Sequence, residues 1–196
     1  MAVFDFDRTL TTKHVGVFDL NSSSCINGHS NDDVAEKVFG GSGRVSMLHH
    51  MLETLEAAGV ELHVVSRNSA YVVKKALAAV GLTYIQSVIG DDELQETPHR
   101  LDPKSEIIRK RLLGEAAGQA DGPHLLFVDD DVANVKDVRA AIEGATVIHV
   151  KEKGMGRQDV DAVYEWLAQT ERHTGVLSQQ IAAAASEPLS PHLAPN

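Results

Sequence analysis

Two aspartates separated by one residue, Asp5 and Asp7, end a short apolar run that has the length of a β-strand. In a regular strand both carboxylates would point to one face. Carboxylates that close repel each other, and the repulsion favours a bound cation or a shared proton. Such a pair suits phosphoryl transfer, in which one carboxylate attacks phosphorus and the other protonates the leaving oxygen and then activates water. A solvated Asp-x-Asp at a strand exit explains the pair equally well.

A second acidic group, Asp129, Asp130 and Asp131, directly follows the apolar run 125–128, with Asn134 three residues further on. Oxygen ligands gathered at a strand end suit a hard cation such as Mg²⁺, which would neutralise phosphate charge during transfer. The alternative is a helix whose N-terminus is decorated with acidic residues, and Asp131 fits that alternative as a cap. Because three adjacent acids exceed what one cap requires, we expect Asp129 and Asp130 to bind metal.

Ser66 and Lys104 are two further polar residues at element boundaries. A hydroxyl group and backbone amides at a strand end can bind phosphate oxygens, but Ser66 alone is explained as well by a helix cap. Lys104 lies at a predicted helix start, where a cation interacts unfavourably with the helix dipole. That placement suggests another role, although a single lysine is usually a surface residue.

The elements that must position these residues alternate between strand and helix. Alternation of this kind predicts a Rossmann-like three-layer α/β/α domain with a mainly parallel central sheet. The candidate residues all fall at carboxyl ends of strands or at helix starts, where such sheets place their sites. Strands are expected at 2–6, 60–65, 84–89, 125–128 and 146–150, and helices at 45–55 with Ser42 as a cap, 71–80, 103–117, 132–142 and 160–167.

The composition bounds the class of protein. A chain of 196 residues with 43% hydrophobic and 23% charged residues has the balance of one globular domain. A net charge of -10 makes nucleic-acid or anionic-membrane binding unexpected, and no apolar run reaches the length of a membrane span. The single cysteine, Cys25, excludes an intramolecular disulfide, and no secretory signal is visible. We therefore expect a cytoplasmic protein.

Taken in order, these motifs resemble the four motifs of the haloacid dehalogenase (HAD) superfamily. The resemblance covers about residues 2–168, and its first and fourth motifs are specific. The fourth motif also resembles that of the small magnesium-dependent phosphatases of the superfamily, whose first motif usually differs from Asp-Phe-Asp-Arg-Thr. The matching motifs are the run 5–11, Ser66 after a strand, Lys104, and Asp129-Asp130 with Asn134.

The resemblance implies a role for each matching position. Asp5 would be the nucleophile and Asp7 the acid and base, while Ser66 and Lys104 would hold the phosphoryl group. The presence of Asp7 favours phosphate chemistry, because dehalogenation in this superfamily does not use that second aspartate. The implied cofactor is Mg²⁺, and the implied metal site consists of Asp5, the backbone carbonyl of Asp7, Asp129 and Asp130.

HAD proteins often carry a cap domain after the first motif or between the second and third. Here the corresponding gaps, 12–41 and about 81–102, are short, so we expect a small flap, a short helix near 34–39 and no large cap. An open site would suit a phosphoprotein, whereas a site covered by homo-oligomer formation would suit a small phosphate ester. Arg67 and Asn68 are expected to contact the substrate, and His14 is expected to lie on the surface.

The chain is expected to form a catalytic domain over residues 1–171, followed by a largely disordered tail over 172–196. The function predicted for that domain is a magnesium-dependent phosphatase that hydrolyses a phosphate monoester through an aspartyl-phosphate. Two alternatives stay open, namely a phosphotransferase with an acceptor other than water and a non-catalytic binding protein with the same fold.

Overall fold

The computed structural model describes residues 1–15, 30–93, 102–114 and 124–186, with the side chains of residues 93 and 173–186 excepted. At its centre five strands form a sheet in the order β3-β2-β1-β4-β5, and every neighbouring pair is parallel. This sheet confirms the α/β class expected from the alternating pattern. The strands are β1 (Ala2–Phe4), β2 (Leu62–Val65), β3 (Ser87–Ile89), β4 (Leu126–Asp129) and β5 (Thr146–His149).

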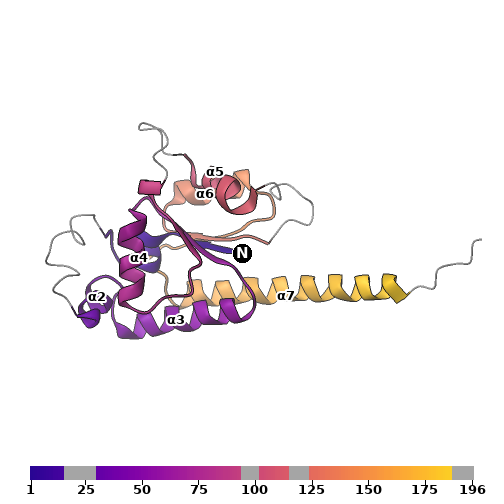
Figure 1. Ribbon diagram of the computed structural model, residues 1–196, viewed down its shortest axis with the longest axis horizontal. Coiled ribbons are helices and arrows are strands. Elements are labelled where there is room, and N and C mark those ends of the chain that lie inside the picture. The colour runs from indigo at the N-terminus through magenta and orange to yellow at the C-terminus, as the bar shows by residue number, and fades with distance from the viewer. Residues whose placement is uncertain (16–29, 94–101, 115–123, 187–196) are drawn as a thin grey trace, which may run out of the picture.

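Helices cover both faces of the sheet, which makes the expected three layers (Figure 1). Successive strand residues point to opposite faces, so Phe4 packs in one hydrophobic core and Val3 in the other. The core around Phe4 is completed by α3 (Ser42–Ala57), α4 (Ala70–Ala79) and α7 (Arg157–Ser186). The core around Val3 is completed by α5 (Lys104–Ile108) and α6 (Val132–Ala141).

The insert after β1 is described in part. A short helix, α2 (Asn31–Lys37), lies slightly earlier than the helix expected near 34–39, and the Ser30 hydroxyl caps it by accepting a hydrogen bond from Asp33 N at 3.3 Å. The expected flap falls mostly on residues 16–29, which include Cys25 and lie outside the described residues. The flap therefore stays a prediction.

Three helix boundaries differ from the sequence expectation. Gly41, not Ser42, is the N-cap of α3, and no side chain supplies a capping hydrogen bond there. After α5 the chain continues as a wider helical turn, η3 (Arg109–Leu113), and the left-handed Gly114 (φ 54°) ends it. The last helix, α7, extends to Ser186 and projects from the body (Figure 1). None of the described helices has both the length and the apolar character that a bilayer span requires.

The first part of the stretch expected to be a disordered tail is thus helical. A helix that is already formed needs no new nucleation to continue, and the run Ala182–Ala185 has high helix propensity. No proline follows Arg157 before Pro188, so none interrupts α7. Residues 187–196 lie outside the described part of the chain, and the domain boundary near 171 stays a prediction.

Candidate active site

A tight turn at the end of β1, η1 (Phe6–Leu10), brings Asp5 and Asp7 into one cleft. Strand β1 already ends at Phe4, so this turn, rather than the strand pleat expected from the sequence, orients the Asp7 side chain. Arg8 has a left-handed backbone (φ 58°), and its N–H donates to Thr11 Oγ1 at 3.1 Å. Thr11 N donates to Phe6 O at 3.0 Å and closes the turn.

Asp5 belongs to a buried ion triad. Lys104 Nζ lies 2.5 Å from Asp5 Oδ1 and 2.8 Å from Asp129 Oδ2, and all three residues are almost completely buried. Lys104 reaches this position from the first turn of α5, whose start is held against α6 by hydrogen bonds from Ser105 to Asp137. The unfavourable placement of Lys104 at a helix start is therefore compensated by two carboxylates.

Burial and charge shift the pKa values in this triad. Burial raises the pKa of Asp5, the Lys104 ammonium lowers it and the Asp129 carboxylate raises it, and the result is a pKa of about 7. Burial by itself lowers the pKa of Lys104, but the two carboxylates outweigh it, so this pKa lies above its ordinary value. Lys104 thus remains a cation, whereas Asp5 holds its proton more tightly than an ordinary aspartate does.

The acidic cluster after β4 is held from several sides. Asp129 accepts hydrogen bonds from Asp131 N at 2.7 Å and from Asn134 Nδ2 at 3.1 Å. Asp131 caps α6, because its carboxylate accepts from Ala133 N at 2.7 Å, as expected. Asp130 is half-buried, and burial and the neighbouring Asp129 raise its pKa.

Three of these carboxylates could hold one cation. Oxygen atoms from Asp5, Asp129 and Asp130 all lie within 4.8 Å of one another. A set made only of carboxylate oxygens fits a hard cation such as Mg²⁺. The Asp7 carboxylate does not belong to this group, so any part of Asp7 in a metal site would fall to its backbone carbonyl, which is the role that the family resemblance implies.

The Asp7 carboxylate is fixed by partners from two other segments. Its Oδ1 accepts from Val15 N at 2.7 Å, and its Oδ2 accepts from Asn68 Nδ2 at 3.2 Å. His14 Nδ1 lies 3.3 Å from Asp7 Oδ2, although the His14 side chain is 70% exposed. Asp7 thus lies at the cleft with its carboxylate oriented by donors, as an acid and base needs.

Three candidate residues follow β2, and only one of them lies at the cleft. Ser66 is buried, and its hydroxyl accepts from Asn68 N at 3.1 Å. The Asn68 side chain is buried as well and points to Asp7 and the Val15 carbonyl. Neither residue is among those that line the cleft. Asn68 holds Asp7, and its expected contact with the substrate stays a prediction. Arg67 does line the cleft.

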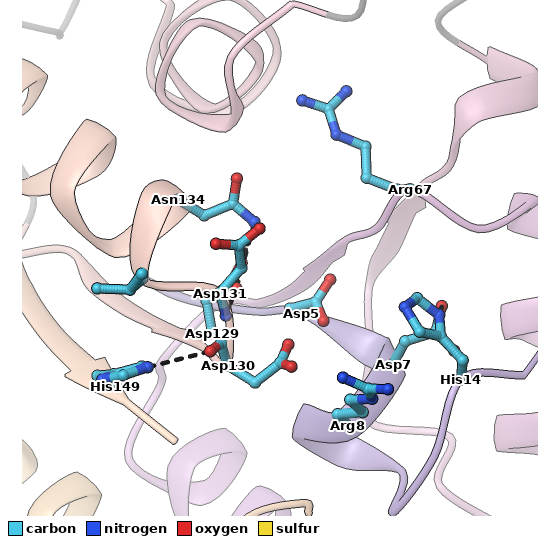
Figure 2. A pocket seen from close by; sticks show the side chains of 11 residues that line it. Asp5, Asp7, Arg8, His14, Arg67, Asp129, Asp130, Asp131, Asn134 and His149 are labelled. Atoms are coloured by element: carbon cyan, nitrogen blue, oxygen red, sulfur yellow. Dashed lines mark hydrogen bonds and ion pairs between the residues drawn. The ribbon is translucent and has the colours of Figure 1, made fainter. Parts of the chain in front are cut away.

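The cleft has a volume of about 420 Å³ and lies at the carboxyl edge of the sheet (Figure 2). His149 borders it from the end of β5, where its Nε2 donates to Asp130 O at 3.0 Å. The cleft brings together seven of the acidic, basic and histidine residues discussed above with Arg8, Val132, Asn134 and His149. Its full lining is Asp5, Asp7, Arg8, His14, Arg67, Asp129, Asp130, Asp131, Val132, Asn134 and His149.

Arg44 of α3 fixes the turn that carries Asp7. Its guanidinium donates to four backbone carbonyls, those of Thr9 (2.9 Å), Leu10 (2.6 Å), Phe39 (2.9 Å) and Met155 (3.0 Å). Burial lowers its pKa to about 10, against the opposing charge of Asp159, so the side chain stays cationic at neutral pH. One side chain thus joins η1 to the insert and to the segment before α7.

The sequence did not identify Arg8, His149 or Arg44 as part of the site. Arg8 had a usable signal, because it stands between Asp7 and Thr9 in the first motif. Arg44 and His149 carry no local signal, since all their acceptors except Phe39 O are backbone carbonyls of residues distant in sequence.

No protein-family model matches the sequence, and no curated protein matches it. Among solved structures, the HAD domain of effector protein Lem4 from Legionella pneumophila is similar, with a TM-score of 0.50, 14% identity, and coverage of 85% of this chain and 93% of that chain. The N-terminal part of the Bacteroides fragilis protein BF1531, which contains a phosphatase domain and is complexed with Mg, gives a TM-score of 0.49 and 17% identity, with coverage of 85% of this chain and 39% of that chain.

Proposed function

Because the chain has the fold of a HAD domain, we propose that it is a magnesium-dependent phosphohydrolase that cleaves phosphate monoesters through an aspartyl-phosphate on Asp5. The observation that carries the proposal is the group of Asp5, Asp129 and Asp130 carboxylates within 4.8 Å of one another, with Asp7 in the same cleft. A nucleophile, a second carboxylate and a set of cation ligands are the parts that phosphoryl transfer needs.

In the first step a carboxylate oxygen of Asp5 attacks phosphorus. The ester P–O bond breaks as Asp7, in its protonated form, gives its proton to the leaving alcohol oxygen. In the second step the Asp7 carboxylate takes a proton from water, and that water attacks the aspartyl-phosphate. Inorganic phosphate leaves, Asp5 regains its carboxylate and Asp7 is protonated again.

The other residues of the site hold these groups in place. Lys104 keeps a positive charge beside Asp5 and favours its ionised form, which is the attacking form. Val15 N and Asn68 fix the carboxylate of Asp7. When bound by Asp5, Asp129 and Asp130, Mg²⁺ would neutralise charge on the phosphoryl oxygens.

Phosphate release from an aryl phosphate, measured with Mg²⁺ and with EDTA, tests this function. We expect Mg²⁺-dependent turnover that Asp5→Asn abolishes, and mass spectrometry after acid quenching should find a phosphoryl group on the peptide that contains Asp5. Asp161→Asn is a matched control, because Asp161 is exposed on α7 and pairs with Arg157. No Mg²⁺-dependent turnover on a broad panel of phosphate esters would refute the catalytic proposal.

A phosphotransferase would use the same first step. Product analysis with added alcohols separates the two activities, since a transferase would form new phosphate esters in place of free phosphate.

A further inference from the structure

The cleft holds basic as well as acidic side chains. The side chains of Asp129 and Asp130 lie to one side of Asp5, whereas Arg67 and Arg8 lie above and below it, with His14 and Asp7 between them (Figure 2). The acidic side chains account for the cation proposed above. The basic side chains have no role in the steps written for Asp5 and Asp7.

Arg8 is held with its backbone in an unusual conformation. Its φ of 58° lies in the left-handed region, a conformation that is unfavourable for residues with a side chain. The backbone is fixed on both sides, because Arg8 N donates to Thr11 Oγ1 and Arg8 O accepts from Gly154 N at 2.8 Å. Its exposed guanidinium has no hydrogen bond or ion pair within the part of the chain that the structure describes. The charge of Arg8 acts on the Asp130 carboxylate and lowers its pKa, but the hydrogen-bond donors of the guanidinium have no partner among the described residues. A strained arginine with unpaired donors at a cleft indicates a function for those donors.

Arg67 has a guanidinium that is only partly engaged. Its Nη2 donates to Asp102 O at 2.6 Å, which fixes the orientation of the group. Its Nη1 is buried, forms an ion pair with Asp91 Oδ1 at 3.9 Å and makes no hydrogen bond to any described residue. The side chain keeps 31% of its surface exposed at the cleft.

We infer that Arg8 and Arg67 form a second anion subsite, so that the substrate is a small phosphate ester whose alcohol part carries another anionic group, a carboxylate or a second phosphate. The inference rests on the proposed function, because it assumes that the reacting phosphoryl group lies at Asp5. Planar guanidinium groups bind carboxylates and phosphates through paired hydrogen bonds.

The reacting phosphoryl group does not need these two arginines. Its position at Asp5 is already next to Lys104, which is buried, whereas Arg8 is exposed at the rim of the cleft. A second anion would otherwise meet an unfavourable field, because five aspartates line the cleft and the chain carries a net charge of -10. Cationic side chains at the rim of the cleft would therefore favour binding of a substrate that carries a second anionic group over one that carries only the reacting phosphoryl group.

Matched pairs of esters test the subsite by turnover. We expect kcat/KM for phosphoglycolate to exceed that for ethyl phosphate at least tenfold, with longer ω-carboxyalkyl phosphates and a bisphosphate covering other spacings. In Arg8→Gln the ratio of kcat/KM for phosphoglycolate to kcat/KM for ethyl phosphate should fall by about tenfold. Arg139→Gln removes a charge from the exposed, far end of α6 and should leave the ratio unchanged.

Equal loss on both esters in Arg8→Gln, or no preference for any anionic ester in the unmodified protein, would overturn the subsite. Binding of phosphonoacetate and methylphosphonate in the presence of Mg²⁺, measured by calorimetry, decides the question without turnover. If no ester is hydrolysed, the proposed function fails, yet tighter binding of phosphonoacetate that Arg8→Gln removes still supports the subsite. Equal binding of the two phosphonates refutes it.

Discussion

The ammonium group of Lys104 lies 2.5 Å from the carboxylate of Asp5, although 99 residues separate the two in the chain. Asp129 is the second carboxylate at this ammonium group, so two buried carboxylates share one cation. This arrangement makes the site sensitive to any change that leaves an unpaired buried charge.

Replacing Lys104 by methionine should destabilise the metal-free protein. Asp5 and Asp129 would then repel each other in a buried position, and we expect a loss of about 3 kcal/mol in the free energy of unfolding at pH 8. Urea unfolding in EDTA measures this loss. Lys110→Met is the matched control, because Lys110 pairs with Glu106 on the exposed surface of the same segment and should change the stability far less. Equal effects of the two substitutions would contradict the role given to Lys104.

The stability of the metal-free protein should fall as the pH rises towards 7. The pKa of Asp5 is raised from 3.8 to about 7 by burial. A carboxyl group whose pKa is higher in the folded protein stabilises the fold below its unfolded pKa, and this contribution is lost as the pH rises through the folded value. Unfolding in EDTA between pH 4 and pH 8 should show a steeper decline for the unmodified protein than for Asp5→Asn, which cannot ionise. Parallel curves would show that Asp5 does not titrate in this range.

Asp130→Asn should weaken Mg²⁺ binding with little effect on the fold. Asp130 is half-buried and its carboxylate is one of the three cation ligands, whereas Asp129 also receives hydrogen bonds that hold the site together. We expect the Mg²⁺ concentration that gives half of the thermal stabilisation to rise at least tenfold, since one charged ligand is lost. Asp131→Asn keeps a good helix cap and should leave that concentration unchanged. The same Mg²⁺ dependence in Asp130→Asn and in the unmodified protein would exclude Asp130 as a ligand.

Arg44→Met should reduce both stability and turnover. Four backbone carbonyls would lose a charged donor, and we expect a loss of about 2–4 kcal/mol in the free energy of unfolding. Because η1 carries Asp7, kcat should fall even at temperatures where the variant is fully folded by circular dichroism. Arg139→Met, on the exposed surface of α6, is the comparison. A folded Arg44→Met with the original kcat would limit Arg44 to a role in stability.

The sequence predicted the sheet because its strands are short apolar runs separated by helices, and all of them except the edge strand β5 are largely buried. It also predicted the residues that follow those strands, since parallel strands bring their carboxyl ends to one edge. Chain direction alone thus placed Asp5 and Asp129 near one another, whereas Lys104 begins α5 and does not directly follow a strand.

The remaining features depend on contacts that no local pattern records. The path of the chain after β2 turns the amide of Asn68 towards Asp7, a contact that the sequence did not indicate. His14 was expected on the surface and is exposed, yet it also borders the cleft because Val15 N binds Asp7. Arg44 looked like one residue of an ordinary helix, and only the fold brings four carbonyls to it.

The position of β1 at the centre of the sheet has a consequence for the order of folding. Ala2 is paired with Leu62 on one side and with Leu126 on the other, so the strand before Asp5 is completed only by contacts of long range in the sequence. Such topology slows folding, because distant segments must meet before the pairing stabilises either of them. During synthesis the ribosome must extend the chain beyond Asp129 before β1 can acquire both neighbours. A nascent chain that stops earlier therefore exposes an unpaired edge of β1, and with it a site for association with other chains.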